Sequence, residues 1–150
     1  ERSGIHFIVA AKERLFQLLA YVKKTKRGGK YLSENPLVRQ KIARLYEDAE
    51  RGLSLAYRVA WSQEQGDVLA SAPLASASKV HGTELVQRVA EYATEIMGLY
   101  GQLGESKWAP LNGAMSDLYQ WCMGATIAIG SNEVQRNIIA WVGLGLPRFK

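Results

Sequence analysis

One apolar pattern constrains the fold of this chain more than any other feature. Between residues 38 and 60, apolar side chains recur at intervals of three or four positions. The members of the series are Val38, Ile42, Leu45, Ala49, Leu53, Ala56 and Ala60. This spacing places all of them on one stripe of an α-helix that is about six turns long. A stripe of that length is buried only against other helices, so it predicts an antiparallel helical bundle.

The first predicted helix covers residues 3–24, and the residues after it give clear stop and start signals. One face of this helix carries Ile5, Ile8, the stem of Lys12, Leu15, Leu19 and Val22. Gly28 and Gly29 end the helix, because glycine is common just past a helix C-terminus. Asn35 then caps the second helix, with Pro36 at the first helical position, where its missing N–H costs nothing.

The remaining long helices follow from the same periodicity and from the residues that interrupt it. Residues 62–71 are polar and contain Gly66, which predicts a connection, and a third helix begins near Pro73. Residues 101–113 form the longest irregular segment, and long loops inside compact domains are often functional. A fourth helix is predicted over residues 114–128.

A short fifth helix follows Gly130, with Ser131 or Asn132 as its N-cap and an end near Val142. No apolar run of period two reaches the length of a strand, so no strand is expected. Residues 1–150 are therefore predicted to form one all-α domain, in which four helices run up-down-up-down and a short fifth helix follows.

The positive charge of the chain is concentrated in one segment. The net charge is +5, and residues 1–30 hold eight Lys and Arg against two Glu, whereas the rest of the chain is balanced. Residues 23–30 read Lys-Lys-Thr-Lys-Arg-Gly-Gly-Lys. Such a segment binds phosphates of nucleic acid, of nucleotide cofactors or of coenzyme A. The alternative is a solvated helix end, whose lysines favour the negative end of the helix dipole.

Common catalytic and metal-binding signatures are missing from the sequence. His6 and His81 fall in separate predicted helices, and a metal site would need more ligands at helical spacing, so no metal is expected. Cys122 is the single cysteine, and we expect it in the core of a cytoplasmic protein without an internal disulfide. The longest apolar run, residues 7–11, is too short to cross a membrane.

The aromatic residues have packing as their expected role. Tyr57, Trp61 and Tyr92 fall at or near core positions of the predicted helices. Trp108 lies in the glycine-rich segment 101–113 and is the aromatic side chain best suited to line a pocket or an interface. Neither role identifies a reaction.

Residues 129–139, Ile-Gly-Ser-Asn-Glu-Val-Gln-Arg-Asn-Ile-Ile, contain the sharpest local signal. A glycine, a hydroxyl residue and an amide open a helix there. The unpaired backbone N–H groups of such a helix start favour a phosphate or the polar edge of a flavin. An ordinary helix cap explains the same residues when they are considered alone.

Together with residues 143–148, Gly-Leu-Gly-Leu-Pro-Arg, this segment resembles the terminal signature of acyl-CoA dehydrogenases. The family pattern is an acidic residue, Gly, Thr or Ser, then x-x-Ile-Gln-Arg-x-Ile-Ile, and it often closes in Gly-Leu-Gly-Leu-Pro-Arg. Glu1-Arg2, Gly29-Lys30 and residues 40–43 also fit family segments in the right order. The resemblance implies that residues 1–150 are the C-terminal helical domain, without the N-terminal helical and middle β-domains. A first residue of Glu1 rather than Met also suggests a fragment.

The resemblance implies a flavoprotein that removes hydrogens from Cα and Cβ of an acyl-CoA thioester. In such enzymes a carboxylate takes the α-proton while FAD accepts the β-hydride. The resemblance further implies an electron-transfer partner and a homo- or hetero-oligomer, in which the bundle of one subunit helps to hold the FAD of its neighbour. The fragment alone is expected to be inactive, because most of the flavin pocket and the acyl cavity belong to the other domains.

The resemblance also implies two groups of FAD-binding residues. The group that follows the usual catalytic position is Gly130, Ser131, Asn132 and Glu133. The group on the basic loop, which meets the FAD of the partner, is Thr25, Lys26 and Arg27. Glu95 and Gly98 complete the set, from a Gln-x-x-Gly-Gly stretch of which only Gly98 survives. The basic loop departs from the family pattern as well, because its arginine is displaced and its phenylalanine is lost.

The usual catalytic glutamate is replaced in this sequence. Its position, directly before Gly130, holds Ile129, which cannot accept a proton. One branch of the family, including the isovaleryl type, places its base on the first bundle helix before an arginine, and Glu1-Arg2 fits that place. We therefore predict Glu1 as the base, with a surface glutamate or a subunit that lacks a base as alternatives. A related branch includes enzymes that act on bulky or branched acyl chains, sterol side chains among them.

Two functional hypotheses follow from these patterns. The first is the FAD-binding and oligomerising bundle of an acyl-CoA dehydrogenase, with neither nucleic acid nor a membrane span involved. The second is a stand-alone basic helical module that binds nucleic acid or a partner protein. The second explains residues 23–30 but not residues 130–139, and it predicts a basic stripe along a helix rather than charge at one turn.

Overall fold

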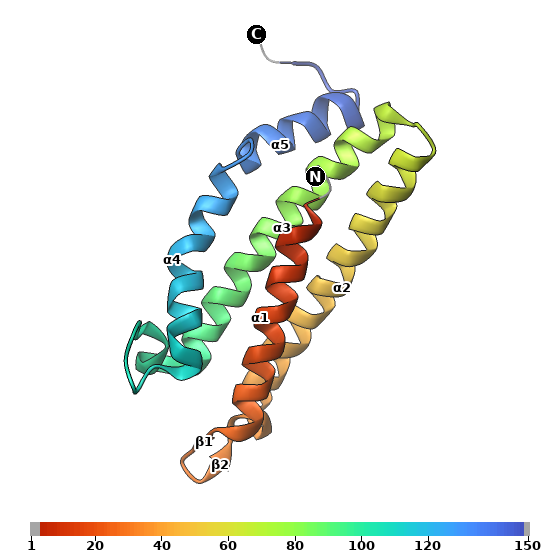
Figure 1. Ribbon diagram of the computed structural model, residues 1–150. Helices are drawn as coiled ribbons and strands as arrows, with labels where there is room; N and C mark the ends of the chain where they lie inside the picture. Colours follow the sequence, from red (N-terminus) through yellow and green to blue (C-terminus); the bar gives the residue numbers. More distant parts are fainter. Residues whose placement is uncertain (1–3, 149–150) are drawn as a thin grey trace.

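Four long helices lie alongside one another, and each runs in the direction opposite to the one before it (Figure 1). The computed structural model describes residues 4–148, and the predicted all-α class is confirmed. The elements are α1 (Ile5–Lys24), β1 (Lys26–Arg27), β2 (Lys30–Tyr31), η1 (Leu32–Glu34), α2 (Pro36–Glu64), α3 (Val68–Met97), η2 (Gly98–Gln102), η3 (Pro110–Gly113), α4 (Ala114–Ile127), α5 (Asn132–Ile138) and η4 (Ile139–Gly143). The short α5 crosses the end of the bundle near the start of α1.

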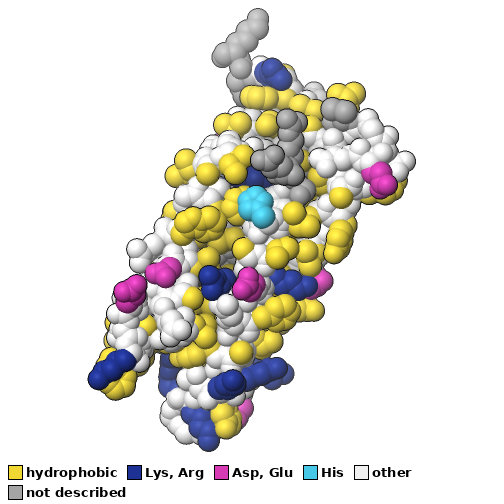
Figure 2. Space-filling view, viewed as in Figure 1, with side chains coloured by type: hydrophobic (Ala, Val, Ile, Leu, Met, Phe, Trp, Pro, Cys, Tyr) yellow, Lys and Arg dark blue, Asp and Glu magenta, His cyan; other side chains and the backbone are white. Residues whose placement is uncertain are grey.

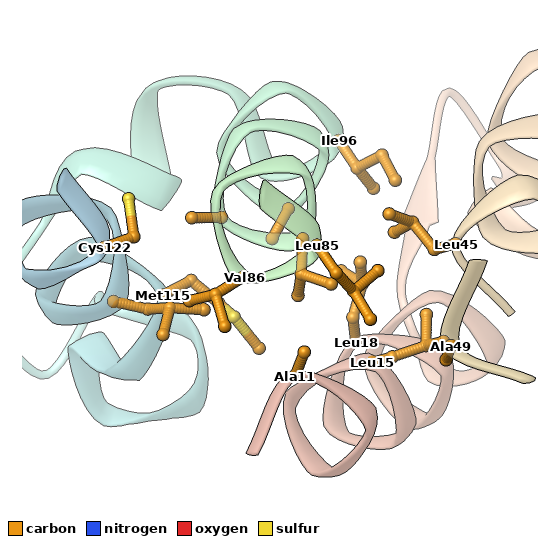
Figure 3. Packing of buried hydrophobic residues seen from close by; sticks show 14 of the residues in the cluster. Ala11, Leu15, Leu18, Leu45, Ala49, Leu85, Val86, Ile96, Met115 and Cys122 are labelled. Atoms are coloured by element: carbon orange, nitrogen blue, oxygen red, sulfur yellow. The ribbon is translucent and has the colours of Figure 1, made fainter. Parts of the chain in front are cut away.

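Helix α3 is the centre of the domain, since it packs against α1 and α2 on one side and against α4 and α5 on the other. Figure 3 shows Leu85 and Val86 of α3 between side chains of the neighbouring helices. Leu15 of α1 and Leu45 of α2 meet α3 from one side, and Met115 of α4 meets it from the other. Because α3 contributes to every part of the core, its position determines where the other helices lie.

The apolar stripe of α2 is confirmed over most of its length. Val38, Leu45, Ala49 and Ala56 are buried, and the remaining members up to residue 53 are partly buried. The stripe is wrong at Ala60, which is exposed, because a straight helix of 3.6 residues per turn drifts away from a 3.5-residue repeat.

The predicted face of α1 is confirmed in part. Ile8, Leu15 and Val22 are buried, but Ile5 is exposed, and the remaining buried positions are Phe7, Ala11 and Leu18. Two glycines allow the first turns of α1 to approach α3 closely. A Cβ on Gly82 would lie 3.1 Å from atoms of Phe7 and Ile8, and a Cβ on Gly4 would lie 2.9 Å from the backbone of Lys79.

The connection predicted within residues 62–71 is confirmed, but its bounds are wrong, because both flanking helices extend into this range and leave only residues 65–67 between them. Helix α2 continues to Glu64, and α3 begins at Val68, so Pro73 lies inside α3. The polar residues Gln and Glu are good helix formers, so polarity alone did not indicate a loop. Asp67 is the N-cap of α3, and its side chain accepts a hydrogen bond of 2.9 Å from the backbone N–H of Ala70.

The expectation of no strands is wrong at one point. Residues 26–31 form a hairpin in which Lys26 pairs with Tyr31 and Arg27 pairs with Lys30. Gly28 and Gly29 make its two-residue turn, with φ values of 59° and 82°. Positive φ at both central residues is the requirement of a type I′ turn, and glycine meets it without steric strain. The glycines therefore form a hairpin rather than ending α1, whose C-cap is Thr25.

The predictions for single side chains have mixed outcomes. Tyr57 and Trp61 are 66% and 62% exposed, so their assignment to the core is wrong, whereas Tyr92 is partly buried. Cys122 is buried as expected, and burial raises the pKa of its thiol. Trp108 is exposed. None of the helices within residues 4–148 is long and apolar enough to cross a membrane.

Candidate functional site

The predicted FAD-binding residues lie in two groups at different points along α3. Arg27 contacts the C-terminal end of α3 at Met97, whereas Asn132 contacts α3 at Lys79 and Thr83. The separation of 18 positions between Lys79 and Met97 corresponds to roughly 27 Å of α-helix. The structure thus brings each group together but keeps the two groups apart.

We call the first group the hairpin end, which comprises residues 25–31 and residues 95–98. The Arg27 guanidinium donates hydrogen bonds from Nη2 to the carbonyl oxygens of Ile96 at 2.9 Å and Met97 at 3.3 Å. Arg27 therefore caps the last carbonyls of α3, where a cation also interacts favourably with the helix dipole. Gly98 follows with φ 66°, and a Cβ on it would lie 3.8 Å from Arg27 Nη2.

The other residues of the hairpin end have defined partners. Glu95 forms an ion pair with Lys41, whose ammonium lies 5.1 Å from the ring centre of Tyr92. The Lys26 ammonium lies 4.6 Å from the ring centre of Tyr31, and the carbonyl of Thr25 accepts a 2.9 Å hydrogen bond from the backbone N–H of Leu32. A cavity of about 540 Å³ lies beside these residues. Its charged lining residues are Arg27, Lys30, Glu34, Lys41, Arg44 and Glu95. Four cations against two carboxylates favour an anionic ligand such as a phosphate.

We call the second group the loop end, centred on the α4–α5 loop of residues 128–131. Ile129 and Gly130 have φ values of 57° and 79°. A β-branched residue rarely adopts such a conformation, so the backbone is strained at Ile129. Ser131 is the N-cap of α5, as predicted, and its hydroxyl oxygen accepts a hydrogen bond of 3.4 Å from the backbone N–H of Val134. A hydrogen bond from Ser131 holds the pKa of Glu133 below its ordinary value.

Two buried residues of α3 hold the loop end and were not identified from the sequence. Asn132 is 3% exposed, and its Oδ1 accepts hydrogen bonds from Lys79 Nζ at 2.8 Å and from Thr83 Oγ1 at 3.1 Å. Lys79 is 6% exposed and also donates to the carbonyl oxygen of Thr126 at 3.3 Å. Burial lowers the pKa of Lys79, and the nearby Glu133 carboxylate opposes this effect. The sequence signal for the burial of Lys79 was its spacing of four positions from Ala75 and from Thr83. This spacing places the lysine on the same face of the helix as these two residues.

A second cavity, of about 480 Å³, lies between α1, α3 and the α4–α5 loop. The lining residues relevant here are Gly4, His6, Ser76, Lys79, Ile129 and Gln135. Ile129 occupies the usual position of the base, and it is 76% exposed. Glu1, the predicted base, lies outside the described residues, but Gly4 and His6 of the same chain segment line this cavity.

The family profile described as "Acyl-CoA dehydrogenase, C-terminal domain" matches residues 1–144 of the chain. This chain belongs to the acyl-CoA dehydrogenase family. The acyl-CoA dehydrogenase FadE26 of Mycobacterium tuberculosis (strain ATCC 25618 / H37Rv) is 36% identical over 123 residues, which cover 81% of this chain and 31% of FadE26. The predicted family and the predicted C-terminal helical domain are thus confirmed.

Solved structures of acyl-CoA dehydrogenases share the fold of this domain. The ChsE4-ChsE5 complex from Mycobacterium tuberculosis matches with a TM-score of 0.84 and 33% identity, covering 93% of this chain and 36% of that chain. The Tcur3481-Tcur3483 steroid ACAD matches with a TM-score of 0.82 and 29% identity, covering 93% of this chain and 35% of that chain. The chain thus spans about a third of the length of these relatives. The match favours the acyl-CoA dehydrogenase hypothesis over a stand-alone basic module.

Proposed function

We propose that this domain is part of an FAD-dependent enzyme that introduces an α,β double bond into an acyl-CoA thioester. The N-terminal helical and middle β-domains belong to the rest of that protein, which is about three times as long as this chain if it matches its relatives. The observation that carries the proposal is the match of residues 1–144 to the C-terminal domain of acyl-CoA dehydrogenases. The candidate FAD-binding residues form two groups roughly 27 Å apart along α3, which supports contacts with two different FAD molecules, one of the same subunit and one of a neighbour.

The hairpin end supports a contact with the FAD of a neighbouring subunit. Thr25, Lys26 and Arg27 precede the exposed turn of the hairpin, next to a cavity rich in cations. A diphosphate is the part of FAD that such a surface would bind. The neighbouring subunit is a second copy of this chain or a related chain, and the two-component ChsE4-ChsE5 relative favours an oligomer.

The loop end supports contacts with the FAD of the same subunit, through Gly130, Ser131, Asn132 and Glu133. FAD supplies the hydride acceptor of the reaction. A carboxylate must take the α-proton, and Ile129 cannot do so. We assign this role to Glu1, because Gly4 and His6 place the start of α1 at the same cavity as Ile129.

The substrate that we propose has a bulky or branched acyl chain. The steroid ACAD among the relatives supports a sterol side chain as the acyl group. The electrons then pass from FAD to a separate electron-transfer partner. A comparison of flavin reduction by a straight-chain acyl-CoA and by a steroid side-chain acyl-CoA tests this assignment, and equal rates for both would contradict it.

The decisive experiment uses the full-length protein that contains this domain. Purified wild-type protein should carry flavin absorbance that acyl-CoA bleaches under anaerobic conditions. Glu1→Gln should retain the bound FAD but lose this reduction, while Glu13→Gln, at an exposed position of α1, should leave it intact. Wild-type protein that binds no FAD would overturn the proposed function, and normal reduction in Glu1→Gln would overturn only the assignment of the base.

A further inference from the structure

A buried lysine links three helices at the loop end. Lys79 projects from α3, and its ammonium donates to the carbonyl oxygen of Thr126 in the last turn of α4 and to the side chain of Asn132 at the start of α5. Residues 128–131 lie between these two attachment points. Lys79 therefore fixes both ends of the α4–α5 loop relative to α3.

Both contacts pair the positive charge of Lys79 with an oxygen acceptor. The carbonyl of Thr126 belongs to the C-terminal end of α4, where the helix dipole is negative. The Asn132 oxygen accepts from Lys79 and from Thr83 together, which fixes the orientation of the carboxamide. A buried ammonium is stable only with such partners, since an unpaired one carries a large desolvation penalty.

The loop between these attachment points depends on restraints from outside it, because the hydrogen bonds that the carbonyl groups of Ile129 and Gly130 accept are weak. Gln135 Nε2 donates to the carbonyl oxygens of Ile129 at 3.3 Å and of Gly130 at 3.5 Å, which are long hydrogen bonds. Ile129 is also held in the left-handed region, and a strained residue keeps its conformation only when its surroundings determine it. The contacts of Lys79 with Thr126 and Asn132 restrain the loop and so keep Ile129 in this conformation.

The rest of α5 has an independent attachment to α3. Arg136 lies one helical turn beyond Asn132 and forms an ion pair with Glu84 of α3. Helix α5 therefore keeps a contact with α3 when the ammonium of Lys79 is removed, so we expect the effect of its removal to be largest in the loop.

We propose that Lys79 is a positioning residue, which holds the α4–α5 loop in the shape that contacts FAD. This inference rests on the proposed function, because it assumes that the loop end binds the cofactor. Lys79 acts through the loop and Asn132 rather than by touching the reacting atoms. Thr83 assists it as the second donor to the Asn132 carboxamide.

The first test measures the loop itself, in the full-length protein without FAD. Lys79→Met keeps the length and apolar stem of the side chain but removes the ammonium. Hydrogen exchange of the amides of Ala128 and Gln135, which donate to Gly124 and Ser131 on either side of the loop, should become about tenfold faster, because the loop loses its charged hydrogen bonds. Lys12→Met removes a partly buried ammonium that pairs with Glu50 in another part of the bundle, and it should leave this exchange unchanged. Unchanged exchange in Lys79→Met would overturn the inference.

The second test measures the effect of the loop on the cofactor. The dissociation constant of FAD, titrated into the apoprotein by flavin fluorescence, should rise about tenfold or more in Lys79→Met, while the melting temperature of the apoprotein stays near that of Lys12→Met. Thr83→Val should shift the dissociation constant in the same direction by a smaller factor. Unchanged FAD affinity in both loop-end variants would refute the positioning role even if the loop exchanges faster. A fall in apoprotein stability that matches the loss of affinity would show a purely structural role. Failure of the wild-type protein to bind FAD would instead refute the proposed function, and the exchange test would still report on the Lys79 contacts.

Discussion

The hairpin end and the loop end hold their polar groups in opposite ways. At the hairpin end, Lys and Arg side chains gather on the surface, as the lower part of Figure 2 shows, and Arg27 and the lysines around it are exposed. At the loop end, the Lys79 ammonium and the Asn132 carboxamide are buried where α3, α4 and α5 meet. Exposed charges are screened by water and salt, whereas buried ones are screened much less.

Because of this difference, we expect the hairpin end to contribute attraction for an anion and the loop end to contribute a precise geometry. The hairpin end provides positive potential, which attracts an anion from any direction but orients it weakly. The loop end provides a fixed backbone shape. Maintaining that shape requires backbone strain at Ile129 and a buried charge at Lys79, and both are unfavourable in themselves. Removal of an acceptor that pairs with the buried Lys79 ammonium should therefore destabilise the fold more than removal of a polar group at the hairpin end.

The largest expected effect is at the loop end. Asn132→Ala leaves the Lys79 ammonium buried with one acceptor fewer, so the free energy of unfolding should fall by about 2–3 kcal/mol. Urea denaturation of the chain measures this change. Asn137→Ala, at an exposed position of the same helix, should change the free energy by less than about 0.5 kcal/mol. Equal effects of the two substitutions would remove the distinction between the two ends.

Backbone strain gives the next effect, with opposite signs at the two ends. Ile129→Gly relieves the left-handed conformation and should raise the free energy of unfolding by about 0.5–1 kcal/mol. Gly29→Ala introduces the same kind of strain into the hairpin turn and should lower it by about 1 kcal/mol. A Cβ on Gly29 would meet no atom within 4 Å, so a steric clash does not confuse the comparison. Thermal unfolding of both variants checks the signs, and a lower stability of Ile129→Gly would argue against strain in the loop.

Arg27→Ala tests the hairpin end and should have a smaller effect. The side chain is exposed, so loss of its two hydrogen bonds and of its charge near the end of α3 should cost about 0.5–1 kcal/mol. Because salt screens the charge of an exposed group, the cost should shrink when urea denaturation is repeated at high ionic strength. Arg58→Ala, at an exposed position of α2, is the matched control. A cost for Arg27→Ala above that of Asn132→Ala would reverse the comparison.

These two ends also show what sequence could and could not predict. The apolar stripe of α2 and the Asn35–Pro36 helix start were predicted correctly, because periodicity and capping are local properties. The turn before α5 was also predicted, with Ser131 as its cap. The contact of Lys79 with Asn132 was not predicted, since it joins residues 53 positions apart, and the spacing of one helix contains no information on its partner.

Errors at the hairpin and between α2 and α3 have a different origin. Two glycines after a lysine-rich helix end are compatible with a helix stop and with a hairpin turn, and only the pairing of Arg27 with Lys30 decides between them. The polar residues before Asp67 are compatible with a loop and with an exposed helix face. In both cases the local signal allowed two structures, and contacts with the rest of the bundle selected one.

The smallest expected effect concerns pH at the loop end. The hydrogen bond from Ser131 lowers the pKa of Glu133 from its ordinary value of 4.5. A carboxyl group whose pKa is lower in the folded state stabilises the fold above pH 4.5 and loses this contribution as the pH falls through its folded pKa. Glu133→Gln should therefore lower the melting temperature slightly at neutral pH and flatten its decline below pH 4.5, whereas Glu91→Gln, at an exposed position of α3, should not. Thermal unfolding across that pH range checks this prediction. An unchanged decline in Glu133→Gln would show that the contact between Ser131 and Glu133 adds no stability beyond that of the buried hydrogen bonds from Lys79 at the same turn.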